Sequence, residues 1–133
     1  MQRYSSGATW EPIVGYSRAV KTGDRVHVSG STSIDSEGNV QGAGDAAEQT
    51  RATLQNIQQA LEHFGLSFAN VYRTRIYVTD IENDWESVGR AHGEVFGEIR
   101  PACTMVEVSK LIDPDMLVEI EAEAYCHNKG EES

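Results

Sequence analysis

The chain has 133 residues and a formal net charge of −10. This length suits one domain with its own core, spanning residues 1–133. The excess of carboxylates argues against binding to nucleic acid or to anionic membranes, because both depend on Lys and Arg side chains. No apolar run is long enough to cross a bilayer and no apolar signal core opens the chain, so we expect a cytoplasmic protein.

The N-terminal part of the chain predicts short strands. A first edge strand is expected over Gln2–Ser5, followed by a hairpin over Tyr16–Val20 and Arg25–Ser29. Gly30 follows the second of these strands, and its missing side chain would let a ligand reach the backbone closely. A plain strand end explains Gly30 equally well.

The clearest predicted helix spans Asp45–Phe64. Apolar residues recur there at helical spacing, Asp45 with Glu48 forms a capping box, and Gly65 is a suitable stop. A second helix is predicted over Asn83–Gly97.

Between the helices, Val71–Thr79 alternates as a strand. One face carries Tyr72, Thr74, Ile76 and Val78, and the other carries Arg73, Arg75 and Tyr77.

The C-terminal part predicts two strands, Ala102–Leu111 and Leu117–Cys126, joined as a hairpin through a turn at Pro114. Alternation would give this hairpin an apolar face and a second face rich in carboxylates. The second face carries Cys103, Met105, Glu107, Glu119, Glu121 and Glu123. Carboxylates are costly to bury without cations or water, so this face must meet solvent, a partner or a cleft. If the strand over Val71–Thr79 joins the sheet, its arginines can pair with these glutamates and no catalysis is needed to explain them.

Several motifs along the chain resemble those of the Rid (YjgF) family of reactive-intermediate deaminases. They are Pro101-Ala102-Cys103-Thr104, Val106-Glu107-Val108, Val118-Glu119-Ile120-Glu121-Ala122, Gly15-Tyr16, Val28-Ser29-Gly30 and Gln49-Thr50-Arg51. The resemblance covers nearly the whole chain. It implies an α+β, chorismate-mutase-like fold, with a mixed sheet and two helices packed on one face. It also implies a homotrimer, in which three sheets form a central barrel and small-molecule clefts lie between subunits.

The resemblance also implies the residues of the cleft. Tyr16, Ser29 and Gly30 would lie on one side, and Cys103, Thr104 and Glu119 on the other. Glu119 matches the glutamate that positions or deprotonates the attacking water, a role suited to a partly desolvated carboxyl group.

Two positions depart from the family pattern. Cys103 replaces the arginine that holds a substrate carboxylate, and a thiol supplies neither its charge nor its bidentate geometry. Gly89 stands where the second helix often carries an asparagine. We favour a small space-filling role for Cys103 over that of a reactive thiol.

Three functions stay open from the sequence. The first is hydrolysis of a small imine, enamine or related C=N compound, and the second is a non-catalytic ligand-binding or regulatory trimer. The third is the endoribonuclease activity of some relatives, which the negative charge disfavours. We expect no cofactor and no metal: the histidines and cysteines lack ligand spacing, and Asp45 would oppose a pyrophosphate at the glycine-rich segment before the first helix.

Overall fold

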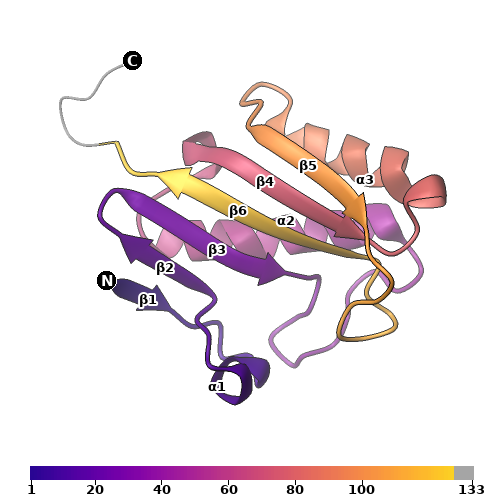
Figure 1. The fold of residues 1–133 in the computed structure, drawn as a ribbon, viewed down its shortest axis with the longest axis horizontal. Helices are drawn as coiled ribbons and strands as arrows, with labels where there is room; N and C mark the ends of the chain where they lie inside the picture. The colour runs from indigo at the N-terminus through magenta and orange to yellow at the C-terminus, as the bar shows by residue number, and fades with distance from the viewer. Residues whose placement is uncertain (128–133) are drawn as a thin grey trace.

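The computed structural model describes residues 1–127 and shows a mixed sheet with two long helices on one face (Figure 1). The elements are β1 (Gln2–Tyr4), α1 (Trp10–Val14), β2 (Ala19–Thr22), β3 (Arg25–Ser31), α2 (Ala46–His63), η1 (Phe68–Asn70), β4 (Val71–Val78), α3 (Ile81–Phe96), β5 (Ala102–Glu107) and β6 (Val118–Tyr125). The predicted α+β class is confirmed. The tail expected to be frayed, 127–133, lies outside the described residues apart from His127.

The strand order in the sheet is β1-β2-β3-β6-β4-β5. All neighbouring strands are antiparallel except β4 and β5, which are parallel and are joined through α3. A helix between two strands is the usual way to connect a parallel pair. The last strand in the sequence, β6, therefore lies in the middle of the sheet, between β3 and β4.

The predicted C-terminal hairpin is wrong. β5 and β6 both form, but β4 lies between them, and β5 ends at Glu107 instead of Leu111. The alternating apolar residues of β6 have the pattern of a buried strand, and each of them is at most 2% exposed. A buried strand needs a neighbouring strand on each side, and β3 and β4 take these two places beside β6. β5 lies at the edge of the sheet, where its side chains are largely exposed.

The faces assigned to β5 were wrong for the same reason. Cys103 pairs with the buried Thr74 and Met105 pairs with Ile76, so both lie on the face that the helices cover. Thr104 pairs with Arg75 on the opposite face. Pairing with β4 thus inverts the alternation that the hairpin had implied.

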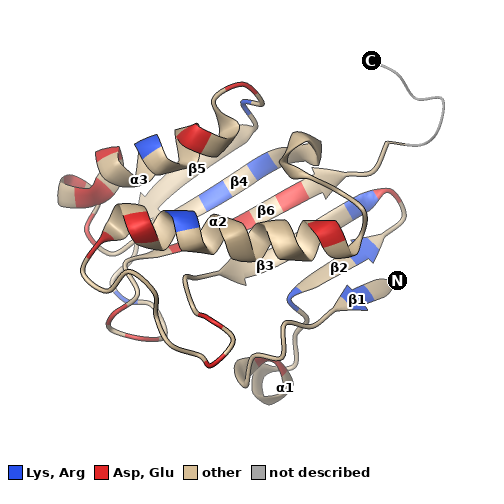
Figure 2. Ribbon diagram, turned by 180° about the vertical axis from the view of Figure 1, so that it is seen from behind, with Lys and Arg blue, Asp and Glu red and all other residues tan. Residues whose placement is uncertain are grey.

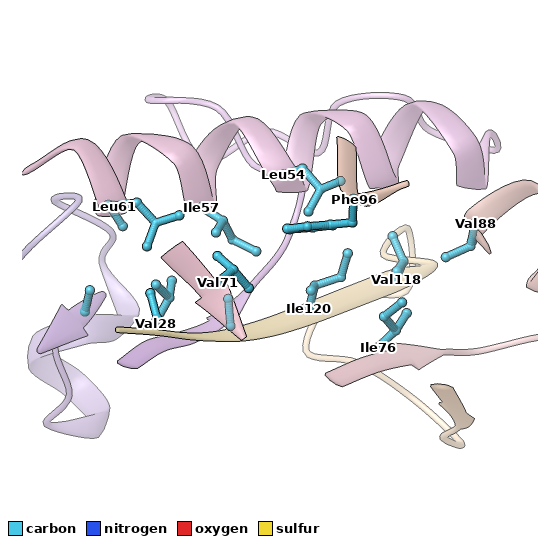
Figure 3. Packing of buried hydrophobic residues seen from close by; sticks show 14 of the residues in the cluster. Val28, Leu54, Ile57, Leu61, Val71, Ile76, Val88, Phe96, Val118 and Ile120 are labelled. Atoms are coloured by element: carbon cyan, nitrogen blue, oxygen red, sulfur yellow. The ribbon is translucent and has the colours of Figure 1, made fainter. Parts of the chain in front are cut away.

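The hydrophobic core lies between the sheet and the helices (Figure 3). From α2, Leu54, Ile57 and Leu61 point to the sheet, where they meet apolar residues of β3, β4 and β6. Phe96 brings α3 into the same core and is 2% exposed. One face of the sheet is therefore used for folding, and the other is left open.

The helix ends follow local capping chemistry. Asp45 caps α2 by accepting a hydrogen bond from the Glu48 backbone N–H at 3.0 Å, and Gly65 follows the helix with a left-handed φ of 74°. The second helix begins earlier than predicted, because Asp80 is its cap and accepts from the Asn83 N–H at 3.3 Å. Only Thr79 and Asp80 lie between β4 and α3, so the chain turns directly from the strand into the helix.

Candidate active site

The open face of the sheet carries paired charges on β4 and β6, which are coloured in Figure 2. Arg75 Nη1 lies 2.6 Å from Glu123 Oε1, and the Tyr77 hydroxyl donates to Glu121. The predicted pairing of arginine with glutamate on this face is confirmed for Arg75. Two of the three β6 glutamates are thus engaged by β4.

Glu119 is the third glutamate of β6, and its surroundings differ. It pairs with Tyr77 in the sheet, and its carboxylate lies against the backbone of Gly30. A β-carbon added to Gly30 would lie 2.4 Å from Glu119 Oε2, which is closer than any side chain allows. The β3–β6 register shifts between Val28 and Ser31, so a bulge brings Gly30 under the carboxylate.

The half-buried position of Glu119 affects its ionisation. Burial raises the pKa of Glu119 above its ordinary value because desolvation disfavours the carboxylate. The positive charge of Arg18 opposes this rise in pKa, and the negative charge of Glu121 adds to it. A raised pKa makes the carboxylate a better proton acceptor, and the acid form can then return the proton.

Glu119 borders a hollow of about 250 Å³ on the open face. Its lining residues are Gly30, Tyr77, Val108, Lys110, Leu111, Glu119 and Glu121. Lys110 adds a cation to a lining that also contains two carboxylates. The hollow has room for a small ligand with polar groups but not for a large cofactor.

Arg18 is buried, and it joins Tyr16 to the Ser29–Ser31 segment, whose Gly30 lines the hollow. Its Nη1 donates to the Gly30 carbonyl at 2.5 Å, to the Ser29 carbonyl at 3.3 Å and to Ser31 Oγ at 3.1 Å. Its Nη2 donates to the Tyr16 hydroxyl at 3.0 Å. The guanidinium therefore fixes Tyr16 relative to the bulge on which Glu119 rests.

Tyr16 and Ser29 line a second, wider depression that runs beside α1. Ser29 Oγ donates to the Ser17 carbonyl at 2.7 Å, which ties β3 to the segment that precedes β2. Four of the predicted site residues, Tyr16, Ser29, Gly30 and Glu119, are thus brought together around Arg18.

Cys103 and Thr104 do not join this group within one chain. Both are exposed on β5, and β4 separates them from β6. Thr104 Oγ1 accepts a hydrogen bond from Arg73 Nη2 at 3.1 Å on the open face, whereas Cys103 lies on the helix face. Within one chain, Glu119 thus lies beside Gly30 and apart from Cys103.

From the sequence, Arg18 is only one of four arginines, with Arg73, Arg75 and Arg100, that could fold into the cleft in place of the missing arginine, and neither Lys110 nor Tyr77 is assigned to the site. Arg18 reaches partners 11 to 13 residues ahead of it, a contact that no local pattern reveals. Lys110 stood inside a predicted strand but follows the end of β5. For Tyr77, the only signal in the sequence was the alternation of the predicted strand Val71–Thr79, which placed Tyr77 on the same face as Arg73 and Arg75.

Within residues 1–127, no three His, Cys, Asp or Glu side chains are close enough to hold a metal ion. Cys103 and Cys126 are both free thiols. Over the same residues, no helix has the length and apolar character needed to cross a membrane.

Comparison with known proteins identifies close relatives. A family model described as endoribonuclease L-PSP matches residues 7–126. An uncharacterised Streptomyces coelicolor protein, SCO2049, is 40% identical over 125 residues, which are 94% of this chain and 92% of that protein. The 3-aminoacrylate deaminase RutC of Acinetobacter baylyi is 36% identical over 114 residues, covering 86% of this chain and 89% of RutC.

A solved structure shares the same architecture. The crystal structure of Rv2704 from Mycobacterium tuberculosis, described as a member of the YjgF/YER057c/UK114 family, superposes with a TM-score of 0.84. It is 50% identical to this chain, and the match covers 93% of this chain and 98% of Rv2704. Sequence and structure agree with the family model, and the chain therefore belongs to the YjgF (Rid) family, described by that model as endoribonuclease L-PSP.

Proposed function

We propose that this protein is a hydrolase of a small imine, enamine or related C=N compound, with Glu119 as the residue that moves protons. The observation that carries the proposal is the half-buried Glu119 carboxylate against Gly30, with its raised pKa and an adjacent polar hollow. RutC, a relative named for deaminating 3-aminoacrylate, supports the reaction class.

The proposed reaction needs one water and one proton shuttle. On the protonated imine, Glu119 accepts a proton from water as the water oxygen attacks the C=N carbon, which gives a carbinolamine with a neutral amine. Glu119 then returns this proton to the nitrogen. As the C–N bond breaks and ammonia leaves, the carbinolamine hydroxyl releases its proton to solvent and a carbonyl compound forms. Both steps are neutral in redox terms, so neither a cofactor nor a metal is required.

The complete cleft, in this proposal, forms between copies of the chain in a homotrimer. Tyr16, Ser29, Gly30 and Glu119 come from one copy. Cys103 and Thr104, exposed on edge strand β5, come from the next copy. The open charged face with its exposed Val106 would be covered by this assembly.

The alternative is a ligand-binding trimer without catalysis. The departure at Cys103 favours it, because the carboxylate anchor of the family is missing. RNA cleavage is disfavoured, because the net charge of −10 opposes binding to phosphates. We place the protein in the cytoplasm, where its two free thiols would stay reduced.

Ammonia release from a panel of imines and enamines tests the proposal. Glu119→Gln should lower turnover by about 10²–10⁴-fold on any substrate that the wild type hydrolyses, the usual effect of losing a general acid–base group. Glu62→Gln, on the exposed surface of α2, is the matched control and should leave turnover unchanged. Undiminished turnover in a folded Glu119→Gln variant would remove Glu119 from the mechanism.

A further inference from the structure

The buried side chain of Arg18 has an unusual set of partners. Arg18 is 8% exposed, and among its contacts in residues 1–127 no carboxylate lies within ion-pair distance. Its hydrogen bonds go to two carbonyls and two hydroxyls. A guanidinium that is removed from water without a direct counter-ion is costly, so its place in the fold calls for an explanation.

Two of the acceptors of Arg18 are backbone carbonyls that shape the site. The Gly30 carbonyl belongs to the residue on which the Glu119 carboxylate rests, and the Ser29 carbonyl is its neighbour in the same bulge. A bulge interrupts the regular ladder of hydrogen bonds between strands. The hydrogen bonds from the guanidinium take the place of the interrupted strand–strand hydrogen bonds. They hold the Gly30 backbone in position against the Glu119 carboxylate.

The hydrogen bond from Arg18 to the Tyr16 hydroxyl determines that this hydroxyl acts as the donor in its next hydrogen bond. A tyrosine hydroxyl has one proton and accepts through its lone pairs. Because Arg18 Nη2 can only donate, the Tyr16 oxygen accepts from it at 3.0 Å, and the hydroxyl proton is left for another partner. Tyr16 is therefore prepared to donate a hydrogen bond to a ligand in the depression that it lines.

Arg18 also acts on charges that it does not touch. Its field lowers the pKa of Glu119 against the larger effect of burial, and it acts in the same direction on the buried Glu11. The other charged or titratable groups around Glu119 are Glu121 on β6, Tyr77 on β4 and Lys110 after β5. Arg18 is thus a fixed, buried cation, whereas Lys110 is exposed.

We propose that Arg18 is the positioning residue of this site: it holds the Ser29–Ser31 bulge under Glu119 and turns the Tyr16 hydroxyl proton toward the ligand. This inference rests on the proposed function, because it states how the residues of that proposed site are held in place. It adds that the ligand carries a hydrogen-bond acceptor near Tyr16. Arg18 does not serve as a substrate anchor, because both Nη atoms are engaged by the protein.

Two substitutions separate the effect of the hydrogen-bond geometry of Arg18 from the effect of its positive charge. Arg18→Met removes both, while Arg18→Lys keeps the charge but loses the fork that reaches Gly30 and Tyr16 together. In Arg18→Met the pKa of Glu119, followed by carbon-13 NMR of its carboxyl group, should shift upward. In Arg18→Lys that pKa should stay near the wild-type value. Amide hydrogen exchange of Gly30 and Ser31 should accelerate in both variants.

Turnover should fall by about 10²-fold in both variants, the scale of loss for a site displaced by about 1 Å. The control is Arg90→Met, an exposed arginine of α3 that pairs with Glu86, and it should change none of these quantities. If Arg18→Met does not fold, exchange and turnover of Arg18→Lys decide the matter.

Wild-type exchange at Gly30 and Ser31 in Arg18→Lys, or an unshifted Glu119 pKa in a folded Arg18→Met, would overturn the assignment. These NMR results do not depend on catalysis. A Glu119→Gln variant that kept full turnover would instead reject the proposed function and leave the Arg18 result standing.

Discussion

The two faces of the sheet differ in what occupies the space beside them. On one face, β6 contributes Val118, Ile120, Ala122 and Ala124, all buried under α2 and α3. On the other face, the same strand contributes Glu119, Glu121 and Glu123, which are only partly buried in one chain. Successive side chains of β6 thus point alternately into the hydrophobic core and toward a polar surface.

The comparison shows how one strand can stabilise the fold and carry the site. Because neighbouring side chains of β6 point in opposite directions, a change at one position need not disturb the next. Stability and activity should therefore respond separately to substitutions that are adjacent in sequence.

The largest expected effect is on stability, at the covered face. Ile120→Ala removes a fully buried side chain and should lower the free energy of unfolding by about 2–5 kcal/mol. Val106→Ala, on the open face of the edge strand and 42% exposed, should change it by less than about 0.5 kcal/mol in the isolated chain. Urea unfolding measures both, and equal losses would mean that the two faces are not distinct.

The next effect is on the site and leaves the fold intact. In Gly30→Ala the new β-carbon would meet the end of the flexible Glu119 side chain, which can swing away, and the Gly30 backbone is outside the left-handed region. We expect turnover to fall by about 10²-fold with little loss of stability.

Gly93→Ala on α3 is the control for Gly30→Ala, because a β-carbon there meets nothing within 4 Å. It should keep full turnover. A Gly30→Ala variant with wild-type turnover would show that the position of the Glu119 carboxylate is unimportant.

A smaller effect concerns the substrate. Wild-type protein should hydrolyse imino acids poorly, because Cys103 supplies no charge and the guanidinium groups of Arg18 and Arg75 are engaged within the chain. Cys103→Arg should raise turnover of imino acids by about tenfold or more, as expected for regained charge-assisted hydrogen bonds. The assay is keto-acid release from imino acids that an amino-acid oxidase generates in situ.

Lys110 is the cation most able to bind the carboxylate of an imino acid in place of the missing arginine, because it lines the hollow beside Glu119. If wild-type protein hydrolyses imino acids efficiently and Lys110→Met abolishes that activity, a lysine has replaced the arginine of the family.

The smallest effect is the pH dependence of stability. Burial raises the folded-state pKa of Glu119 above its unfolded value of about 4.3, so Glu119 favours the folded state at low pH, and this contribution is lost as pH rises through the folded pKa. Glu119→Gln should therefore be more stable than wild type at pH 8 and show no such gain at pH 4. Thermal unfolding at both pH values measures this, and an advantage at pH 4 alone would contradict the burial of the carboxyl group.

Much of the fold was predictable from local pattern. The alternation of Val118 to Ala124 correctly predicted a strand with one apolar face, and Asp45 and Gly65 correctly marked the ends of α2. These features depend on side chains a few residues apart, which the sequence displays directly.

The remaining features depend on contacts between distant segments. Nothing in the local pattern of β5 indicates that it pairs with β4 and not with β6, and this choice decides which face Cys103 occupies. The meeting of Gly30 with Glu119 spans most of the chain and requires a bulge whose place is set by the whole sheet. The resemblance to the Rid family named these residues, but only the structure shows that Arg18 connects them.

The central claim is that further copies of the chain cover the open face and complete the site. Light scattering coupled to size-exclusion chromatography measures this directly, at micromolar concentration and neutral pH. The expected result is a mass of three chains of 14.6 kDa each. A single species at 14.6 kDa would contradict the claim, because Cys103 and Thr104 would then have no route to Glu119.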